Sequence, residues 1–184
     1  MTGETLVLVL GLAAALALMV MMLWSIAFPQ RRLWPPKEST PLNRMTAWAL
    51  TVMIFASAGV LAVLDWNALG WPAALRWGLG GGLIVVGNVV VWRGAFRMGM
   101  LATSGAEGEL ITDGMYRYSR HPQYMADIGI LIGAAILSAS PVVMLVAASG
   151  VAVLLVAALA EEPWLAARHG EAWQRYSLRT RRFI

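Results

Sequence analysis

The sequence predicts an all-α integral membrane protein with about five transmembrane helices in a single domain. Of its 184 residues, 59% are hydrophobic and 13% are charged, and the mean hydropathy is +0.67. A soluble domain of this size would be less apolar. The apolar residues are concentrated in long runs, and most charged residues lie between the runs. This pattern is expected where short polar loops connect membrane helices.

Residues 5–28 form the first apolar run, which is long enough to cross about 30 Å of hydrocarbon at ~1.5 Å per residue. The alternative is a cleaved signal peptide, which requires a positive charge before its apolar core. The charge that precedes this run is instead the acidic Glu4. We therefore expect a retained helix, which Pro29 and the pair Pro35-Pro36 bring to an end.

Residues 45–64 and 75–92 are the second and third predicted spans. The third span contains glycines suited to close contact with another helix: Gly78, Gly82 and Gly87. Near its end, we expect Asn88 to hydrogen-bond across to a neighbouring helix. The polar stretch that follows, residues 93–120, is predicted to be a cytosolic loop or a partly interfacial segment.

Two further apolar runs complete the set of spans: residues 123–137, which are short for a span, and residues 142–160. A tight turn at residues 138–141 joins them, so they predict a C-terminal helical hairpin. The remaining residues, 161–184, form a polar cytosolic tail that is expected to be helical up to about Tyr176.

The distribution of basic residues predicts the topology. With five spans, alternate loops share one side of the membrane. Every Lys and Arg except Arg76 then lies on one side, in the loop after the first span, the loop after the third span or the tail. The positive-inside rule places that side in the cytoplasm. We expect a bacterial-type inner membrane with the N-terminus outside and the C-terminus cytoplasmic, and no nucleic acid partner.

The chain contains no cysteine and two histidines. The lack of cysteine excludes disulfides, thiolate metal sites and a cysteine nucleophile. Because the two histidines are far apart in the sequence, we expect no metal site.

His121 stands where a polar loop meets a membrane helix, and several chemically useful residues surround it. Pro122 suits the first turn of a helix, whose free N–H groups can bind an anionic group. Tyr124 and Asp127 follow, about one helical turn apart. Two roles remain open for Asp127, namely compensation of the helix dipole and participation in chemistry at the membrane edge.

Glu161 and Glu162 stand where the last apolar run ends. The C-terminus of a helix disfavours acidic side chains, so two of them there suggest a function such as binding hydroxyls or a cation. Because the hairpin turns at residues 138–141, its two cytoplasmic ends meet. We therefore expect His121 and Tyr124 to lie close to the two glutamates.

Two sequence blocks carry a family resemblance. The first is residues 114–124, Gly-Met-Tyr-Arg-Tyr-Ser-Arg-His-Pro-Gln-Tyr, and the second comprises Glu161-Glu162, His169-Gly170-Glu171, Trp173, Tyr176 and Arg182-Phe183-Ile184. Together they resemble the membrane methyltransferases typified by isoprenylcysteine carboxyl methyltransferase, a superfamily that includes phospholipid N-methyltransferases. The resemblance covers about residues 93–184. Gln123 departs from it, because the family often has a small or apolar residue there.

The resemblance implies an S-adenosyl-L-methionine-dependent methyltransferase that acts on a lipid or lipid-linked acceptor, such as a prenylcysteine-type carboxylate, at the cytosolic membrane face. It implies the following cofactor-binding residues: Tyr116, His121, Pro122, Tyr124, Glu161 and Glu162. It also links Arg120 and Arg179 to acceptor chemistry as catalytic residues. A guanidinium can hold a carboxylate or phosphate through two parallel N–H bonds. The alternative for these arginines is that they anchor the protein to lipid phosphates.

Other functions compete with this one. The acceptor could instead be a phospholipid amine or a small thiol. A small membrane transporter or assembly protein would carry charged residues inside its spans, and only Asp127 and Asn88 suggest this. A sterol-type reductase would have a similar C-terminal hairpin.

Overall fold

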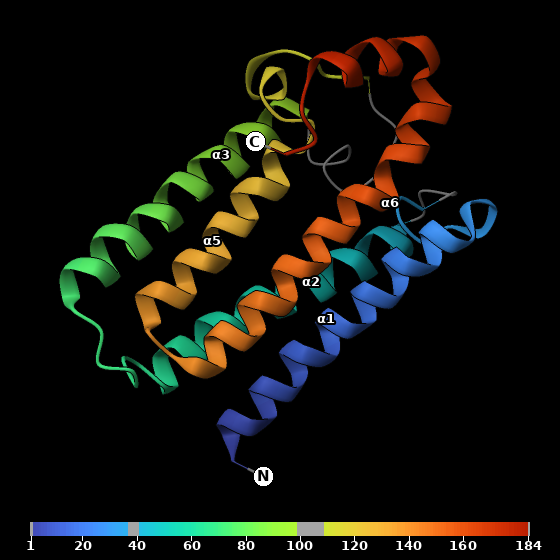
Figure 1. Cartoon of the computed structure of the whole chain (residues 1–184). Coiled ribbons are helices and arrows are strands. Elements are labelled where there is room, and N and C mark those ends of the chain that lie inside the picture. The colour runs from blue at the N-terminus through green and yellow to red at the C-terminus, as the bar shows by residue number, and fades with distance from the viewer. Residues whose placement is uncertain (1, 37–40, 99–108, 184) are drawn as a thin grey trace.

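The computed structural model describes residues 2–36, 41–98 and 109–183, and these residues form a bundle of long helices (Figure 1). The long helices are α1 (Gly3–Ala27), α2 (Pro41–Leu64), α3 (Gly82–Met98, preceded by the π-helical turns η2, Ala74–Gly81), α5 (Pro122–Ser138) and α6 (Pro141–Arg179). Short 3-10 helices are η1 (Pro29–Arg31) and η3 (Gly114–Arg117). The basic residue Lys37, residues 99–108 of the polar stretch and Ile184 of the second motif block lie outside the described ranges.

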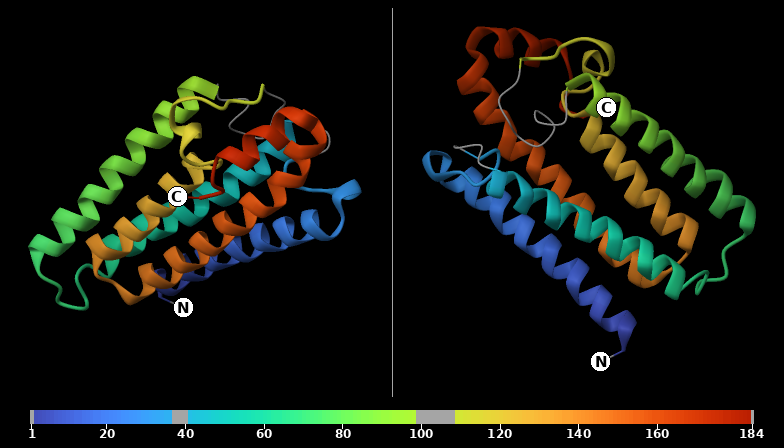
Figure 2. Two further views of the ribbon diagram at one scale, coloured as in Figure 1. Left: turned by 45° about the horizontal axis from the view of Figure 1, so that its top comes forward. Right: turned by 180° about the vertical axis from the view of Figure 1, so that it is seen from behind.

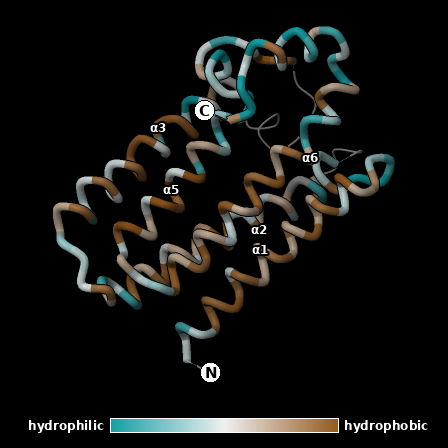
Figure 3. Tube along the Cα trace, viewed as in Figure 1, coloured by the Kyte–Doolittle hydropathy of each residue, from teal (hydrophilic) through white to brown (hydrophobic). Residues whose placement is uncertain are grey.

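The lengths of these helices suit a membrane. Four spans in the described residues are long and apolar enough to cross it: Gly3–Ala27, Met45–Leu64, Ala74–Phe96 and Pro141–Arg179. The fifth helix, α5, is apolar but has only 17 residues, which is about 26 Å at 1.5 Å per residue and near the lower limit for a span. Apolar residues follow the helices, and polar residues gather at one end (Figure 3). The predicted all-α membrane fold is confirmed.

The helices α5 and α6 form the centre of the bundle. α5 packs against α3 on one side and against α6 on the other, and α6 also packs against α1. α2 contacts α1, α6 and α5, and α5 separates α2 from α3 (Figure 2). The C-terminal hairpin predicted from the sequence therefore forms the core around which the N-terminal helices assemble.

Glycines spaced seven residues apart bring α3 and its π-helical start into close contact with α5: Gly80, Gly87 and Gly94. A Cβ at Gly87 would lie 2.8 Å from the backbone oxygen of Ala126 and 2.6 Å from the side chain of Ile130. A Cβ at Gly80 would lie 2.6 Å from the backbone nitrogen of Leu137. Seven residues make about two turns, so these glycines share one face of the helix. Their lack of a side chain lets the backbones approach.

The prediction for Gly78 and Gly82 was wrong, because a Cβ added at either would meet nothing within 4 Å. These two glycines lie off the face that α5 covers, whereas Gly87 lies on it as predicted. The prediction for Asn88 was also wrong. Its amide donates to the carbonyl of Ile84 at 2.9 Å, four residues earlier in the same helix, instead of crossing to a neighbour.

The hairpin turn forms at residues 138–141 as predicted. Ala139 ends α5 in the left-handed conformation with φ 46°, and Pro141 begins α6. Ser140 caps α6 by accepting a hydrogen bond from the backbone N–H of Val143 at 3.3 Å. Its hydroxyl also donates to the carboxylate of Asp65, which joins the turn to the end of α2.

Arg76 is the basic residue that does not follow the positive-inside pattern. Its side chain is buried, with 5% of its surface exposed. The Nε atom donates to the carbonyl of Leu137 at 2.8 Å, and the guanidinium lies 4.2 Å from the ring centre of Trp66. Arg76 therefore satisfies a carbonyl at the C-terminus of α5, which is a structural reason for a charge at this end of the bundle.

At the polar end, α6 continues far beyond the bundle. Of its 39 residues, the part before Gly170 (residues 141–169) corresponds to about 44 Å at 1.5 Å per residue, which exceeds the thickness of a bilayer core of about 30 Å. Gly170 breaks the helix with φ 50° and ψ −125°, a conformation that side-chain-bearing residues rarely adopt. The chain after Gly170 turns back over the ends of the other helices (Figures 1 and 2). The tail is helical to Arg179, slightly beyond the predicted limit at Tyr176.

Candidate active site

The two sequence blocks are joined by hydrogen bonds at the polar end. The backbone N–H of Arg120 donates to the carbonyl of Arg181 at 2.9 Å. The hydroxyl of Tyr176 donates to the carbonyl of Tyr116 at 2.7 Å. The C-terminal tail is thereby fixed against the loop that leads into α5.

His121 lies at the centre of the charged cluster and has 5% of its surface exposed. Its Nδ1 atom is 3.4 Å from Glu161 Oε2, and its Nε2 atom is 3.4 Å from Glu162 Oε1. The second contact does not have hydrogen-bond geometry, so Nε2 has no hydrogen-bond partner among the described residues. The imidazole is stacked on the ring of Tyr124, with centres 5.5 Å apart and planes 6° from parallel. The structure thus brings together the four residues expected to meet at the hairpin ends.

Two opposing effects act on the pKa of His121. Burial lowers it, whereas the two neighbouring glutamates raise it by a larger amount in total, so the pKa lies above its ordinary value of 6.5. The cluster therefore stabilises the imidazolium form relative to a free imidazole. Nearby, burial and the carboxylate of Glu161 raise the pKa of Tyr116, which keeps its phenol protonated.

Glu162 has the largest number of charged neighbours in the cluster. Arg182 binds it through two parallel contacts, Nε to Oε1 at 2.9 Å and Nη2 to Oε2 at 2.7 Å. Arg120 Nη2 lies 3.2 Å from Oε1. Glu162 therefore ties the tail to the loop. Glu161 is less engaged, since its ion pair within the described residues is with His121, and its side chain is 20% exposed.

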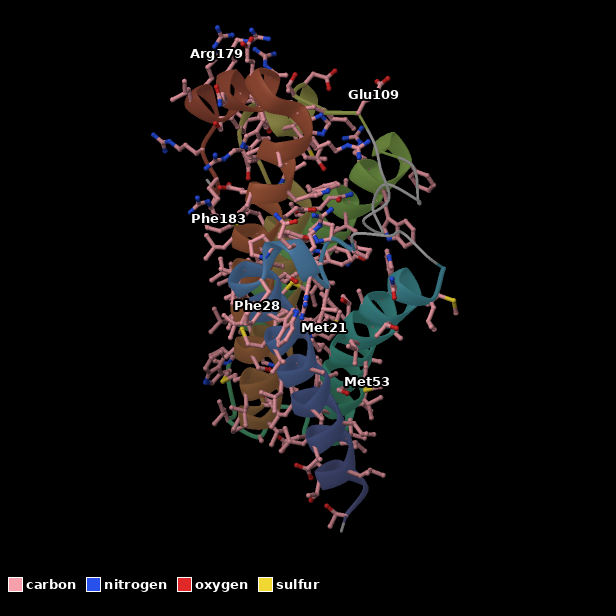
Figure 4. The ribbon with its side chains drawn as sticks, turned by 90° about the vertical axis from the view of Figure 1, so that its right-hand side faces the viewer. Met21, Phe28, Met53, Glu109, Arg179 and Phe183 are labelled. Carbon is pink, nitrogen blue, oxygen red and sulfur yellow. The ribbon has the colours of Figure 1, made fainter. Side chains whose placement is uncertain are left out.

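The two predicted catalytic arginines differ in their positions. The side chain of Arg120 is 13% exposed and lies 5.8 Å over the ring of Trp173, and its Nε atom is buried without a hydrogen-bond partner in the described chain. Arg179 is the exposed last residue of α6, and no ion pair or hydrogen bond links it to the cluster within the described residues. Figure 4 shows Arg179 near the tip of the polar end, with Phe183 closer to the bundle. The arginine of the tail that reaches the cluster is Arg182, which the sequence interpretation had not placed in the site.

A cavity of about 550 Å³ lies beside the cluster, among α1, α2, α3, α5 and α6. Its volume is within the range of small-molecule sites. Most of its wall is apolar, and the side chains in it that carry polar groups are Thr51, Asn88, Gln123, Tyr124, Asp127 and the three tryptophans Trp34, Trp48 and Trp92. Within the described residues α2 does not pack closely against α3. The lining residues Trp48 on α2 and Trp92 on α3 are 40% and 54% exposed, so the cavity wall reaches the lipid-facing surface.

Trp34 is a site residue that the sequence interpretation missed. It follows α1 and is held in place by Ser25, whose hydroxyl accepts hydrogen bonds from the N–H groups of Leu33 at 3.0 Å and Trp34 at 2.9 Å. The Trp34 side chain is 8% exposed and lines the cavity. A large aromatic residue directly before the Pro35-Pro36 pair was the available signal.

These features define an integral membrane protein in which a buried charged cluster adjoins an apolar cavity. The sequence profile of the phospholipid methyltransferase family matches residues 75–172, which include α3, α5, the first motif block and the glutamate pair. The match covers more than half of the chain, and the chain therefore belongs to this family of membrane methyltransferases. No curated protein and no solved structure matched the chain. Family membership favours an enzyme over a transporter, an assembly protein or a reductase.

Proposed function

We propose that the protein transfers a methyl group from S-adenosyl-L-methionine to a lipid or lipid-linked acceptor at the cytosolic face of the membrane. The observation that carries this proposal is the position of Tyr124. Its ring is stacked on His121 in the charged cluster, and it also lines the apolar cavity. One side chain is thus shared by a polar site suited to a water-soluble donor and an apolar site suited to an amphiphile.

The residues of the cluster fit S-adenosyl-L-methionine, which supplies a methyl group activated by a sulfonium. Glu161 offers a partly exposed carboxylate for an amine or hydroxyls, and the Nε2 atom of His121 is a buried group without a hydrogen-bond partner. The stacked rings of His121 and Tyr124 provide an aromatic face for a cationic group. The residues proposed to bind the donor are Tyr116, His121, Pro122, Tyr124, Glu161 and Glu162.

The acceptor is proposed to occupy the cavity, which an amphiphile can reach from the bilayer. A prenylcysteine-type carboxylate, a phospholipid amine and a lipophilic thiol are the candidate nucleophiles. We retain Arg120 and Arg179 as residues that orient an anionic group of the acceptor. The buried, unpartnered Nε atom of Arg120 supports the first assignment. For Arg179 the support is its place in the motif block.

Calorimetric titration of the purified protein with S-adenosyl-L-methionine tests the donor site. Glu161→Gln, Glu162→Gln and His121→Ala should each weaken binding by roughly 1.5–3 kcal/mol, the free energy of a charge-assisted hydrogen bond. Glu171→Gln is the matched control, because its side chain is 88% exposed and pairs only within its own helix turn in the described structure. Unchanged binding in all three site variants would place the donor elsewhere.

Incubation with radiolabelled donor and a membrane lipid extract tests the activity and identifies the acceptor class. Arg120→Lys and Arg179→Lys should lower turnover while leaving donor affinity near that of the parent, because lysine cannot copy a bidentate contact. Arg175→Lys, at a side chain that is 69% exposed, is the control. Full turnover in either lysine variant would return that arginine to a membrane-anchoring role.

A further inference from the structure

Two arginine side chains converge on Trp164 at the polar end of the bundle. Trp164 and Arg168 belong to α6, one helical turn apart, whereas Arg32 belongs to the loop that follows α1 and lies beside α6 (Figure 1). The guanidinium of Arg32 lies 6.0 Å from the ring centre of Trp164, and that of Arg168 lies 5.8 Å from it. Two positive charges so close to one ring repel each other, and an anion within reach of both relieves the repulsion.

The charge of Arg32 is not compensated by an acidic side chain. Partial burial lowers the pKa of Arg32 below its ordinary value, and no acidic neighbour in the described structure offsets this effect. Arg182 shows the opposite case, because its hydrogen bond to Glu162 and the charge of this carboxylate raise its pKa. A cation that has lost part of its hydration without gaining an acid is stabilised by an anion from outside the protein.

The guanidinium of Arg32 is already held in position. Its Nε atom donates to the carbonyl of Pro35 at 2.8 Å, and the two Nη groups make no hydrogen bond within the described residues. The residue is only partly buried, so a ligand can reach these groups. A guanidinium offers a phosphate two parallel N–H bonds. Because the loop fixes the side chain before a ligand binds, the entropic cost of binding is reduced.

These arginines lie at the level where lipid head groups are expected. The distance along α6 from Pro141 to Trp164 is about 34 Å, just beyond the ~30 Å of a bilayer core. Trp24 and Phe28, at the end of α1, are 42% and 49% exposed, with ring centres 4.5 Å apart (Figure 4). The indole N–H of Trp24 donates to the carbonyl of Arg31 at 3.1 Å, which places this apolar surface next to the basic loop.

We propose that Arg32, Trp164 and Arg168 form a binding site for the head group of an anionic phospholipid at the membrane edge. The Nη groups of Arg32 hold the phosphate, Arg168 supplies a second positive charge, and an acyl chain lies over Trp24 and Phe28. A head group with its own ammonium meets like charges and is disfavoured. None of the three head-group residues lines the cavity or belongs to the charged cluster, so this site does not depend on the proposed function.

Native mass spectrometry of the detergent-solubilised protein tests the proposal with phosphatidylglycerol and phosphatidylcholine of the same acyl chains. Both lipids carry a phosphate, only the first has a net negative charge, and neither has a free amine, carboxylate or thiol to accept a methyl group. The parent should retain phosphatidylglycerol more tightly. Arg32→Gln should reduce this preference about fivefold, which corresponds to ~1 kcal/mol per arginine at a membrane surface. Arg168→Gln, which leaves the contact with Pro35 intact, should reduce it as well. Arg175→Gln, at a side chain that is 69% exposed, is the control.

Each outcome supports or overturns the lipid site. Equal retention of the two lipids by the parent overturns it, even if a variant does not fold. A preference that is unchanged in folded Arg32→Gln and Arg168→Gln, checked by gel filtration, also overturns it, as does an equal loss in Arg175→Gln. Excess inorganic phosphate, compared with chloride at the same ionic strength, distinguishes the source of the phosphate. Release of the lipid by phosphate alone would identify a site for a free anion and overturn the assignment to a lipid.

Discussion

Replacement of Glu162 by glutamine should destabilise the polar end of the protein more than any other single charge removal in the cluster. Glu162 contacts Arg182 through two bonds of 2.9 and 2.7 Å, Arg120 at 3.2 Å and His121 at 3.4 Å. Glutamine keeps the shape of the side chain but leaves three basic groups without this carboxylate. Two of them, Arg120 and His121, are 13% and 4% exposed at the side chain, so water compensates them poorly.

The size of the effect follows from this burial. Removing one partner of a buried ion pair costs about 3–5 kcal/mol. The Arg182 side chain is 41% exposed, and its contact is screened by solvent and contributes less. We therefore expect a loss of about 2–3 kcal/mol in the free energy of unfolding. For a chain of this size this corresponds to a decrease in Tm of roughly 4–12 °C.

Two assays measure the loss. Thermal unfolding in detergent reports the overall change, and limited trypsin digestion with mass spectrometry reports release of the tail. Cleavage after Arg179 or Arg181 should be faster in Glu162→Gln, because Arg182 no longer fixes the tail to Glu162. Glu161→Gln is the matched comparison, since its described ion pair is a single contact of 3.4 Å with His121. It should change Tm much less.

An equal Tm for Glu162→Gln and the parent, with equal protection of the tail, would refute the reasoning. It would mean that the ion pairs around Glu162 contribute no net stability. A larger loss for Glu161→Gln than for Glu162→Gln would mean that the single ion pair of Glu161 contributes more to stability than the several ion pairs of Glu162.

Four further predictions concern other parts of the molecule. Because the pKa of His121 is raised in the folded protein, the stabilising contribution of this residue is complete below pH 6.5, its ordinary pKa, and is lost as the pH rises through the folded-state pKa. The difference in Tm between the parent and His121→Gln should therefore shrink with rising pH. A difference that stays constant with pH would contradict this. Gly87→Ala should cost about 1–3 kcal/mol through overpacking against α5, whereas Gly82→Ala, with open space around it, should be neutral in the same thermal assay. Arg76→Leu should cost about 1–2 kcal/mol through the lost hydrogen bond and ring contact, and a Tm equal to that of the parent would show that the arginine is not structural. A reporter fused after Ile184 should be active only in the cytoplasm, and activity only outside would reverse the proposed topology.

The sequence was sufficient to predict the helices and the general position of the site. Membrane spans are long and uniformly apolar, because the bilayer core requires every backbone group to be paired within the helix. Residues 138–141 marked the hairpin turn, and a hairpin must bring its two ends together. The approach of His121 to Glu161 therefore followed from chain connectivity and local pattern, without knowledge of how the other helices pack.

The sequence did not determine which faces of the helices meet. Several glycines occur in residues 75–98, and only the packing of α5 selected the face that carries Gly80, Gly87 and Gly94. Similarly, Arg179 and Arg182 lie in the same motif block, but α6 ends at Arg179, and the chain beyond this end brings Arg182 to Glu162. These outcomes depend on the rotation of a helix about its axis and on the path of the tail, which composition and periodicity do not report.

The cavity was decided by tertiary structure alone. Trp34 and Asp127 are separated by more than ninety positions in the printed sequence, and they line one cavity because α1 packs on α6 while α5 packs between α2 and α3. A charged motif is local and can be identified along the chain. The residues of a cavity wall come from helices distant in sequence, and the cavity becomes apparent only when all the neighbouring helices are in place.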